Sequence, residues 1–433
     1  MLNSILSKSA AKVMANTSPS QFIIEARFIN SEPGSKFSYY PFMIEHITIN
    51  RDYIENFGDE IDISMKISPK DYALLQDQGQ NLLCILTITY VNKYFNTVYT
   101  PPPIRRQYNV MINNPRDIRK AIPDVQAYTE PQTDITIRLI EPTIYRLRHT
   151  KINTVYQNLT PTQAIHAITK SFEIEKIQMV SLDNTHKYDH IEIPSYQGIS
   201  SIYGYLHSKV GLYQKGATSY ITNEVLYIYP PFETNPTYDK TAIFYQVATG
   251  NYAGSHIFHR TENKSISIVI NSQPESYDLS IAGAENVGTG FVFTRASHMT
   301  DGFTTVNSKE GAQFTNKPAL TVSLNDSRTV MKDVNNVFHI KATDNPFPAM
   351  SQIVSHQASL MEVIWQNADP FQLDPGHAIS YYYDKDERMV KKTGILEKAL
   401  YQFSIITKKD GKDIFGAVGQ LVLRLSPNST MVL

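Results

Sequence analysis

The sequence EIDISMKI, Glu60–Ile67, alternates polar and apolar residues without a break. Ile61, Ile63, Met65 and Ile67 share one side of an extended chain, and the polar residues share the other. A period of two residues is typical of a β-strand with one buried face and one face toward solvent. This stretch therefore predicts a strand of an antiparallel sheet.

The same character extends on both sides of this strand. Ser68 and Pro69 follow it and suit the N-cap and first position of a short helix. Thr100–Arg106 contains three successive prolines, so we expect a stiff extended loop here rather than a paired strand. Further strands are expected at Gln21–Ile29, Met43–Ile49, Asn81–Val91 and Thr133–Ile140.

A helical pattern replaces the alternation in the middle of the chain. Thr160–Gln163 reads TPTQ, which supplies an N-cap, a proline at the first helical position and a capping box. A second helix is expected over Gly198–Val210, with Gly211 in the position that a C-cap glycine prefers. We expect residues 212–214 and 224–229 to form the strand pair that follows.

Strands return in the last part of the chain. Those expected at 265–270, 290–294 and 320–324 are separated by spacers rich in Gly, Asn, Ser and Thr, and a three-strand meander is expected between 360 and 406. The predicted divisions are a flexible N-terminal arm at 1–18, a first tube-like β-barrel at 19–141, an α/β domain at 142–236, a loop-rich β region at 237–345 and a second tube-like β-barrel at 346–433.

Charge and hydropathy exclude several classes of protein. The 433 residues carry 40 Lys and Arg against 41 Asp and Glu, a net charge of -1. Binding nucleic acid through bulk positive charge needs a cationic surplus, so no such role and no sequence-specific nucleic-acid contact is expected. No apolar run reaches the roughly 18 residues that span a bilayer. Lys8 and Lys12 interrupt what would be the apolar part of a secretory signal.

Two histidine pairs are the best candidates for a metal site. His186 and His190 are four residues apart beside Asp189, but the segment reads as a loop and not as a helix that would align them. His256 and His259 are three apart in or beside a strand, where odd spacing points side chains to opposite faces. We therefore expect no metal and no cofactor.

Other residues of chemical interest have structural explanations. Cys84, the single cysteine, lies in an apolar run and is expected in the core rather than as a nucleophile. Arg105 and Arg106 are expected to be a solvated or interface pair, and the glycines of segment 283–290 do not have dinucleotide-binding spacing. Paired carboxylates for glycoside hydrolysis need not be near in sequence, and nothing selects a pair. We therefore predict no catalytic, cofactor-binding or metal-binding residue.

The centre of the chain contains a distinctive succession of four segments: Thr160–Ile165, Ile191–Pro194, Gly198–Tyr213 and Glu224–Pro230. This succession resembles the mixed domain of baseplate (tail) hub proteins from contractile-tailed bacteriophages, and of the base of type VI secretion spikes. Leu373–Ile379, with a Leu-x-Pro-Gly turn, and Gly394–Leu396 are similar to the second barrel of that family.

This resemblance implies an α+β, mostly β fold with two tube-like antiparallel β-barrel domains, 19–141 and 346–433, and an inserted or adjacent α/β domain. It implies a non-enzymatic homotrimer that joins the hexameric tail tube to the threefold central spike and forms part of the DNA channel. The implied partners are the tail tube protein and the central spike protein, with the tape measure protein and baseplate wedge as further neighbours. Since the sequence ends at Leu433, the spike is expected to be a separate chain. The implied location is the virion tail baseplate, assembled in the host cytoplasm.

Two other classes stay open at this point. The Tyr-rich β composition also suits a glycan-binding or glycan-degrading baseplate or surface enzyme, which paired carboxylates in a groove would support. A further alternative is another β-rich virion subunit, such as a capsid or tail-fibre component. A threefold ring with a central channel favours the hub, whereas a monomer with a deep acidic cleft favours the enzyme.

Overall fold

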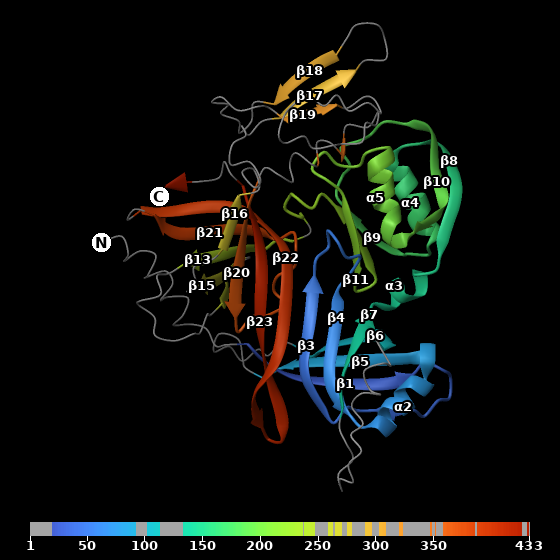
Figure 1. Ribbon diagram of the computed structural model, residues 1–433, viewed down its shortest axis with the longest axis vertical. Coiled ribbons are helices and arrows are strands. Elements are labelled where there is room, and N and C mark those ends of the chain that lie inside the picture. Colours follow the sequence, from blue (N-terminus) through green and yellow to red (C-terminus); the bar gives the residue numbers. More distant parts are fainter. Residues whose placement is uncertain are drawn as a thin grey trace.

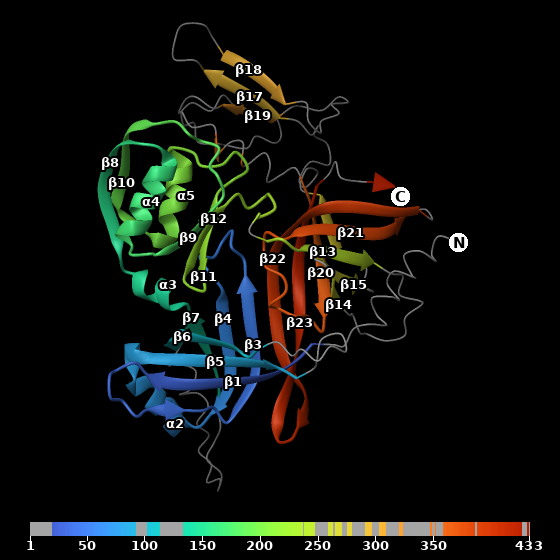
Figure 2. The same cartoon turned by 180° about the vertical axis from the view of Figure 1, so that it is seen from behind.

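The computed structural model describes three connected parts of a mostly β chain (Figure 1). Seen from behind in Figure 2, the α/β unit lies on one side and the C-terminal strands on the other, above the N-terminal strands. The described residues are 20–91, 102–112, 133–236, 238–246, 259–262, 265–270, 275–278, 291–296, 303–308, 320–323, 347–348, 351, 358–385, 388–426 and 431–432.

Eight antiparallel strands close into a barrel, in the order β22-β3-β4-β7-β6-β5-β1-β23, with β23 pairing back to β22. The predicted fold class, mostly β with an antiparallel barrel, is confirmed. The strands are β1 (Gln21–Asn30), β3 (Met43–Arg51), β4 (Glu60–Ile67), β5 (Leu82–Tyr90), β6 (Ile104–Ile112), β7 (Thr133–Ile140), β22 (Arg388–Lys409) and β23 (Lys412–Leu425).

The alternation of the opening stretch explains how β4 packs. Ile61, Ile63, Met65 and Ile67 are all buried in the barrel core. Ser64, on the other face, is also buried. Its hydroxyl has a hydrogen-bond partner there, the Thr136 hydroxyl of the neighbouring strand β7, at 2.8 Å. Helix α2 (Pro69–Asp77) follows as predicted, with the Ser68 side chain accepting from the Asp71 amide. The short β2 (Ser38–Tyr39) and the 3-10 turn η1 (Gly79–Asn81) complete this region.

Strands β22 and β23 are long enough to belong to two sheets. Residues 399–404 of β22 pair with β3, and residues 415–416 of β23 pair with β1, which closes the barrel. Residues 388–395 of β22 pair with β21 (Ala378–Lys385), and residues 418–425 of β23 pair with β20 (Ser359–Gln366). The barrel is thus closed by C-terminal residues, so the stretches 19–141 and 346–433 share one barrel. The second sheet continues through β13 (Thr241–Gln246), β14 (His259–Glu262), β15 (Ser265–Ile270) and β16 (Glu275–Asp278), and β24 (Met431–Val432) pairs with β22.

The second sheet is mixed rather than wholly antiparallel. Strand β13 runs parallel to both of its neighbours, β15 and β21. Parallel neighbours need a long connection between them, which the chain supplies because β13 and β21 are far apart in sequence. A separate three-stranded sheet holds β17 (Phe291–Ala296), β18 (Phe303–Ser308) and β19 (Leu320–Ser323).

The α/β unit packs two helices against short strands around its own core. The capping box at Thr160 and Gln163 is present, and Gly211 has a φ of +77° after the second helix, as a C-cap glycine should. Its elements are α3 (Pro142–Leu147), β8 (Lys151–Leu159), α4 (Pro161–Ser171), β9 (Lys176–Met179), β10 (Tyr188–Gly198), α5 (Ile199–Lys209), β11 (Thr218–Thr222) and β12 (Val225–Tyr229).

Two local predictions are wrong. Residues 212–214 are not a strand: β12 pairs instead with β11, because the Asn223-Glu224 turn makes that hairpin. Ile104–Arg106 is not loop but the start of β6, paired with β5, since the prolines end before Ile104 and do not interrupt the ladder. The predicted N-terminal arm lies outside the described residues. In the described part of the chain, no helix has the length and apolar character needed to cross a membrane.

Cys84 is a core residue of β5, fully buried, and its burial raises the pKa of its thiol. We expect Cys84→Ala to lower the free energy of unfolding by on the order of 1 kcal/mol, since the change removes one buried sulfur. Denaturant unfolding measures this, and a thiol reagent should label the native wild type only at the rate of unfolding. Rapid labelling of native protein would contradict the assignment of Cys84 to the core.

Candidate functional site at the junction of the barrel and the α/β unit

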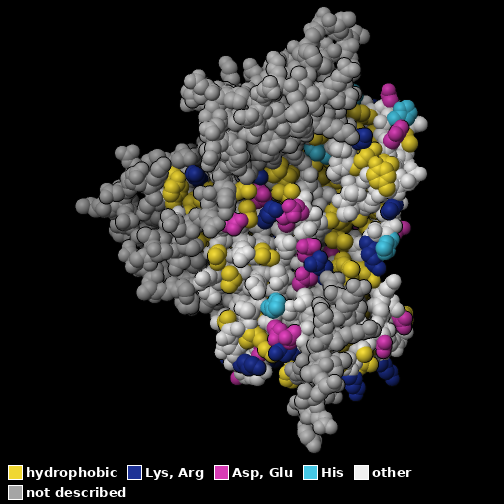
Figure 3. All heavy atoms as spheres, viewed as in Figure 1, with side chains coloured by type: hydrophobic (Ala, Val, Ile, Leu, Met, Phe, Trp, Pro, Cys, Tyr) yellow, Lys and Arg dark blue, Asp and Glu magenta, His cyan; other side chains and the backbone are white. Residues whose placement is uncertain are grey.

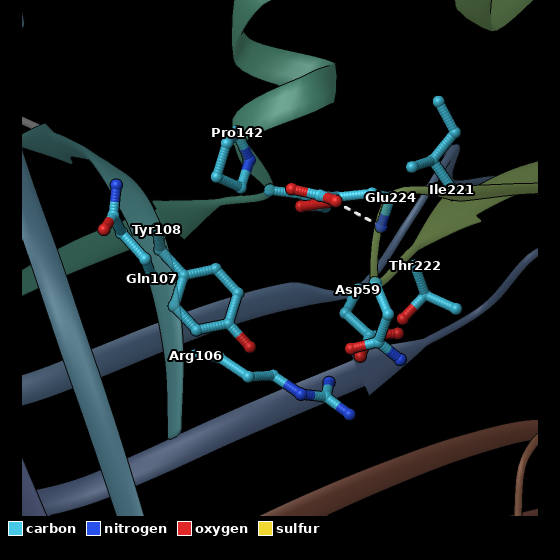
Figure 4. Close-up of a pocket in the computed structure, with 10 residues that line it drawn as sticks. Asp59, Arg106, Gln107, Tyr108, Pro142, Ile221, Thr222 and Glu224 are labelled. Atoms are coloured by element: carbon cyan, nitrogen blue, oxygen red, sulfur yellow. Dashed lines mark hydrogen bonds between the residues drawn. The ribbon is translucent and has the colours of Figure 1, made fainter. Parts of the chain in front are cut away.

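A pocket of about 420 Å³ lies where the barrel meets the α/β unit (Figure 4). Strand β6 forms one wall, the link from β7 to α3 forms the top, and the β11–β12 hairpin faces them. The lining residues are Asp59, Arg106, Gln107, Tyr108, Glu141, Pro142, Ile221, Thr222, Asn223 and Glu224.

The hairpin wall of the pocket is held by one carboxylate. Asn223 and Glu224 both have positive φ, of 52° and 62°, which matches a two-residue type I′ turn. Glycine is usual at the second position, so Glu224 is strained there. The carboxylate of Glu141, at the start of α3, accepts from the Glu224 amide at 2.9 Å. Burial raises the pKa of Glu141. Glu141 therefore joins the barrel exit to the strained turn.

Below the pocket, the buried Arg51 at the end of β3 connects three parts of the chain. Its guanidinium forms ion pairs with Asp59 at 3.3 Å and with Asp374 at 3.0 Å. It also donates to the carbonyls of Pro370 and Leu373. Burial by itself lowers the pKa of Arg51, but the two carboxylates outweigh this effect and hold that pKa well above its ordinary value. Arg51 thus attaches the 370–374 segment to the barrel.

A stack of tyrosines joins the β3–β4 loop to the hairpin. The Tyr53 ring lies parallel to the Tyr220 ring at 3.6 Å between centroids, and the Tyr227 ring also stacks on Tyr220, at 4.8 Å. The Tyr53 hydroxyl donates to the Asp59 carboxylate at 2.6 Å. The same carboxylate forms the ion pair with Arg51. Burial raises the pKa of Tyr53 well above its usual range, so the hydroxyl stays protonated and keeps donating.

The Leu373–Ile379 segment makes a tight turn over this network. Gly376 has a φ of +99°, and its carbonyl accepts from the amide of Asn235. The His377 ring accepts from the Asp374 amide at 3.0 Å and stacks on Tyr238 at 4.1 Å. Burial lowers the pKa of His377, which favours the neutral ring that can accept this hydrogen bond.

A second buried carboxylate, Asp369, lies beside the same segment. It accepts from the Tyr90 hydroxyl at 3.1 Å and from the Phe371 amide at 3.1 Å. Burial raises the pKa of Asp369 from 3.8 to about 6, and these hydrogen bonds offset only part of that effect.

This shift predicts a pH dependence of stability. Because the pKa is higher in the folded state, the folded protein binds the proton more tightly between about pH 4 and pH 6. The free energy of unfolding should therefore fall as the pH rises through this window, by roughly 2 to 3 kcal/mol. We expect Asp369→Asn to remove this contribution, so that its stability relative to wild type increases from pH 4 to pH 7 in urea unfolding. A difference that does not change with pH would contradict the assignment.

Ion pairs also join the β3–β4 loop to β22. Lys398 of β22 forms ion pairs with Asp52 and Glu55 of the β3–β4 loop. Figure 3 shows acidic and basic side chains gathered at the centre of this face, over the upper ends of β3 and β22. The loop is thus held to the barrel from both its buried and its exposed side.

The carboxylates at the junction connect different parts of the chain. Asp59 is shared by Arg51 and Tyr53, and Glu141 is held by the strained turn, so two of the pocket's three carboxylates have structural partners. Among the described residues, no group of three or more His, Cys, Asp and Glu side chains is placed to hold a metal ion.

The residues singled out from the sequence do not meet at this site, with one exception. Arg106 lines the pocket, while Arg105 is exposed on the strand beside it. His186 and His190 are exposed in the α/β unit, before and within β10. His256 and the 283–290 glycines lie outside the described residues, and His259 begins β14. The sequence analysis did not single out four charged residues of the junction: Arg51, Asp59, Glu141 and Asp374. The signal in the sequence that could have indicated them is a charged residue beside a strand end or before a Pro-Gly turn.

Comparison with known proteins supports the fold through structure alone. No protein-family model and no curated protein matches the chain. The structure is similar to a tail protein from Neisseria meningitidis, with a TM-score of 0.51, 9% identity and coverage of 93% of this chain and 96% of that chain. A 43 kDa tail protein of prophage MuSo2 from Shewanella oneidensis matches with a TM-score of 0.48 and 12% identity, over 92% and 96% of the two chains.

A third match is an E. coli component of the type VI secretion system, described as similar to the T4 bacteriophage tail proteins gp27 and gp5. Its TM-score is 0.42 at 9% identity, over 94% of this chain and 79% of that chain. The likeness to the Neisseria tail protein confirms, at the level of the fold, the resemblance inferred from the sequence.

Proposed function

We propose that the protein is a structural subunit of a contractile-tail baseplate, a homotrimeric hub that joins the hexameric tail tube to a threefold spike. The observation that carries the proposal is the fold likeness to the Neisseria tail protein over nearly the whole of both chains. A match that spans barrel, α/β unit and second sheet together is a match in architecture, and not only in one common barrel.

The arrangement of the two β parts suits this role. The long β22–β23 hairpin belongs to both sheets, so force on one sheet passes to the other through continuous backbone hydrogen bonds. Arg51 and the tyrosine stack attach the α/β unit and the 370–374 segment to the same barrel. A rigid subunit of this kind suits a ring that must keep a channel open. The net charge of -1 suits a channel through which DNA passes without binding.

Electron microscopy and mass measurement of the purified protein test the proposal. We expect threefold rings with a central channel and a mass of about three chains in sedimentation. A monomer at all concentrations that also fails to assemble with tail tube and spike proteins would contradict the hub. The tube and spike contacts are tested separately, by co-sedimentation with each partner.

A glycan-binding or glycan-degrading protein is the second candidate, and the pocket favours it because Asp59, Glu141 and Glu224 line one cavity beside Arg106 and Tyr108. Glu224→Gln is the diagnostic variant, since the Glu224 side chain is exposed and the backbone contact to Glu141 is kept. We expect neither hydrolysis of cell-wall glycans by wild type nor any effect of this variant on assembly. Glycan hydrolysis by wild type that is lost in Glu224→Gln would favour the enzyme.

A further inference from the structure

Strand β1 has an open edge along part of its length. Only Gln21 and Phe22 pair with β23, and only Phe28 and Ile29 pair with β2. Between them, the 23–27 segment has no strand partner on this side within the described residues, while its other side pairs continuously with β5. An unpaired edge of this kind is a template for a strand from another chain.

The backbone direction of this edge follows from the ladder. Gln21 directs its carbonyl to Val91 at the end of β5, at 2.9 Å. Since successive residues of an antiparallel strand direct their backbone groups to opposite sides, Ile24 and Ala26 direct theirs to the open edge. The chain beyond β2 would continue the ladder here, but Pro41 follows Tyr40 and has no amide to donate.

A groove of about 280 Å³ lies along this edge. One wall is the 40–44 segment and the other is Lys412, Asp413 and Phe415 of β23, with residues 23–26 between them. Phe42, at the rim, is 76% exposed, and Tyr40 is 60% exposed. Both are large apolar side chains that a monomer would leave in water.

Further exposed apolar side chains lie on the neighbouring strands of the same face. On β23, Val418 pairs with Gln366 of β20, and Gly416 pairs with Gln21 of β1. Since Gly416 and Val418 are two residues apart on one strand, they lie on the same outer face. The half-exposed Ile406 lies over Gly416 on this face, where a Cβ would be 3.1 Å from the Ile406 side chain. Five of the ten exposed large apolar side chains among the described residues belong to this region: Tyr40 and Phe42 follow β2, Ile364 lies on β20, Ile406 on β22 and Val418 on β23. We call these five residues and the 23–27 edge the seam face.

The charges of the seam face favour a second copy of this chain as its partner. Glu25 pairs with Lys412 across the groove at 3.0 Å, and Lys408 pairs with Asp413 at 3.2 Å. Figure 3 shows apolar side chains beside acidic and basic ones over the end of the β22–β23 hairpin. A face with balanced charges, on a chain of net charge -1, meets another copy without repulsion, whereas a strongly charged partner would find no complement.

We propose that the seam face is a contact between copies of this chain, in which an extended segment of the neighbouring copy pairs with the open edge of β1. The proposal rests on the proposed homotrimer, of which it names the interface. Backbone pairing to Ile24 and Ala26 supplies the register, and Phe42 supplies buried apolar area. A ring built in this way repeats one head-to-tail contact.

Sedimentation of surface variants of the full chain tests the interface. Phe42→Lys, alone and with Val418→Lys, should raise the dissociation constant of the oligomer at least about tenfold, because a large exposed aromatic side chain of the proposed contact is replaced by a charge. Leu74→Lys, on exposed α2, is the matched control and should leave the oligomer unchanged. Tyr40→Lys is a second test variant if Phe42→Lys does not fold, which circular dichroism shows.

Hydrogen exchange tests the strand pairing itself, because it measures the protection of individual backbone amides of β1. In the oligomer, the amides of Ile24 and Ala26 should exchange slowly, and in Phe42→Lys they should exchange fast, while those of Ile23 and Glu25 stay protected by β5. A wild-type trimer that persists in both lysine variants would overturn the seam face and leave the hub standing. A wild type that is monomeric at all concentrations would overturn the seam face, and if it also fails to assemble with tail tube and spike proteins it would overturn the hub as well. Protection of Ile24 and Ala26 in a monomeric variant would show that the chain covers its own edge, and would also overturn the proposal.

Discussion

Replacement of Arg51 by methionine should lower the free energy of unfolding by about 3 to 5 kcal/mol. Methionine has a similar length and fills the same space, but it leaves Asp59 and Asp374 without their buried counter-charge. Removal of one partner from a buried ion pair is costly because the remaining charge stays desolvated. The carbonyls of Pro370 and Leu373 lose their donor as well. Urea unfolding of the two proteins at neutral pH measures the difference.

Arg146→Met is the matched control for this experiment. Arg146 forms an ion pair with Glu173 at 3.5 Å, but both side chains are at least half exposed, so the variant should change stability by less than about 1 kcal/mol. Adding Asp59→Asn to Arg51→Met should restore part of the lost stability, because it removes one uncompensated buried carboxylate. Equal losses in Arg51→Met and Arg146→Met would show that the Arg51 network does not hold the junction.

Substitution of Gly394 by alanine should be comparably destabilising, by about 3 kcal/mol or more. A Cβ at this position would lie 2.0 Å from the Arg424 carbonyl oxygen and 2.9 Å from the Leu425 Cα. Both are backbone atoms of β23, so the clash cannot be relieved by a side-chain rotation. The strands would have to separate where Arg424 forms a buried ion pair with Glu397, so that pair would be disturbed too. Thermal unfolding measures the loss.

Gly204→Ala is the opposite case and serves as the control. Gly204 is exposed inside helix α5, and apart from its chain neighbours and the surrounding helix backbone no atom lies within 4 Å of a Cβ placed there. Alanine has the higher helix propensity, so this variant should be more stable by about 0.5 to 1 kcal/mol. The same substitution is therefore expected to have opposite signs at the two sites. Destabilisation of similar size at both would refute the close strand approach at Gly394.

Local sequence determined the elements whose signals are themselves local. The alternation in Glu60–Ile67, the capping box at Thr160 and the glycine after α5 each correspond to one strand or one helix end. The two local errors have the same origin. Three successive prolines predict a loop, but they end directly before β6, and the turn at Asn223-Glu224 pairs β12 with β11 rather than with residues 212–214.

Tertiary structure alone decided which strands close the barrel and where the buried charges meet. Nothing in the 19–141 stretch shows that its barrel needs β22 and β23, because pairing between residues some 350 positions apart leaves no periodic signal. Arg51, Asp59 and Asp374 each look like ordinary solvated charges in sequence, and only the fold brings the Pro-Gly turn onto the end of β3. The open edge of β1 is likewise invisible in sequence, because a strand's own residues specify its faces but not what lies beside its backbone.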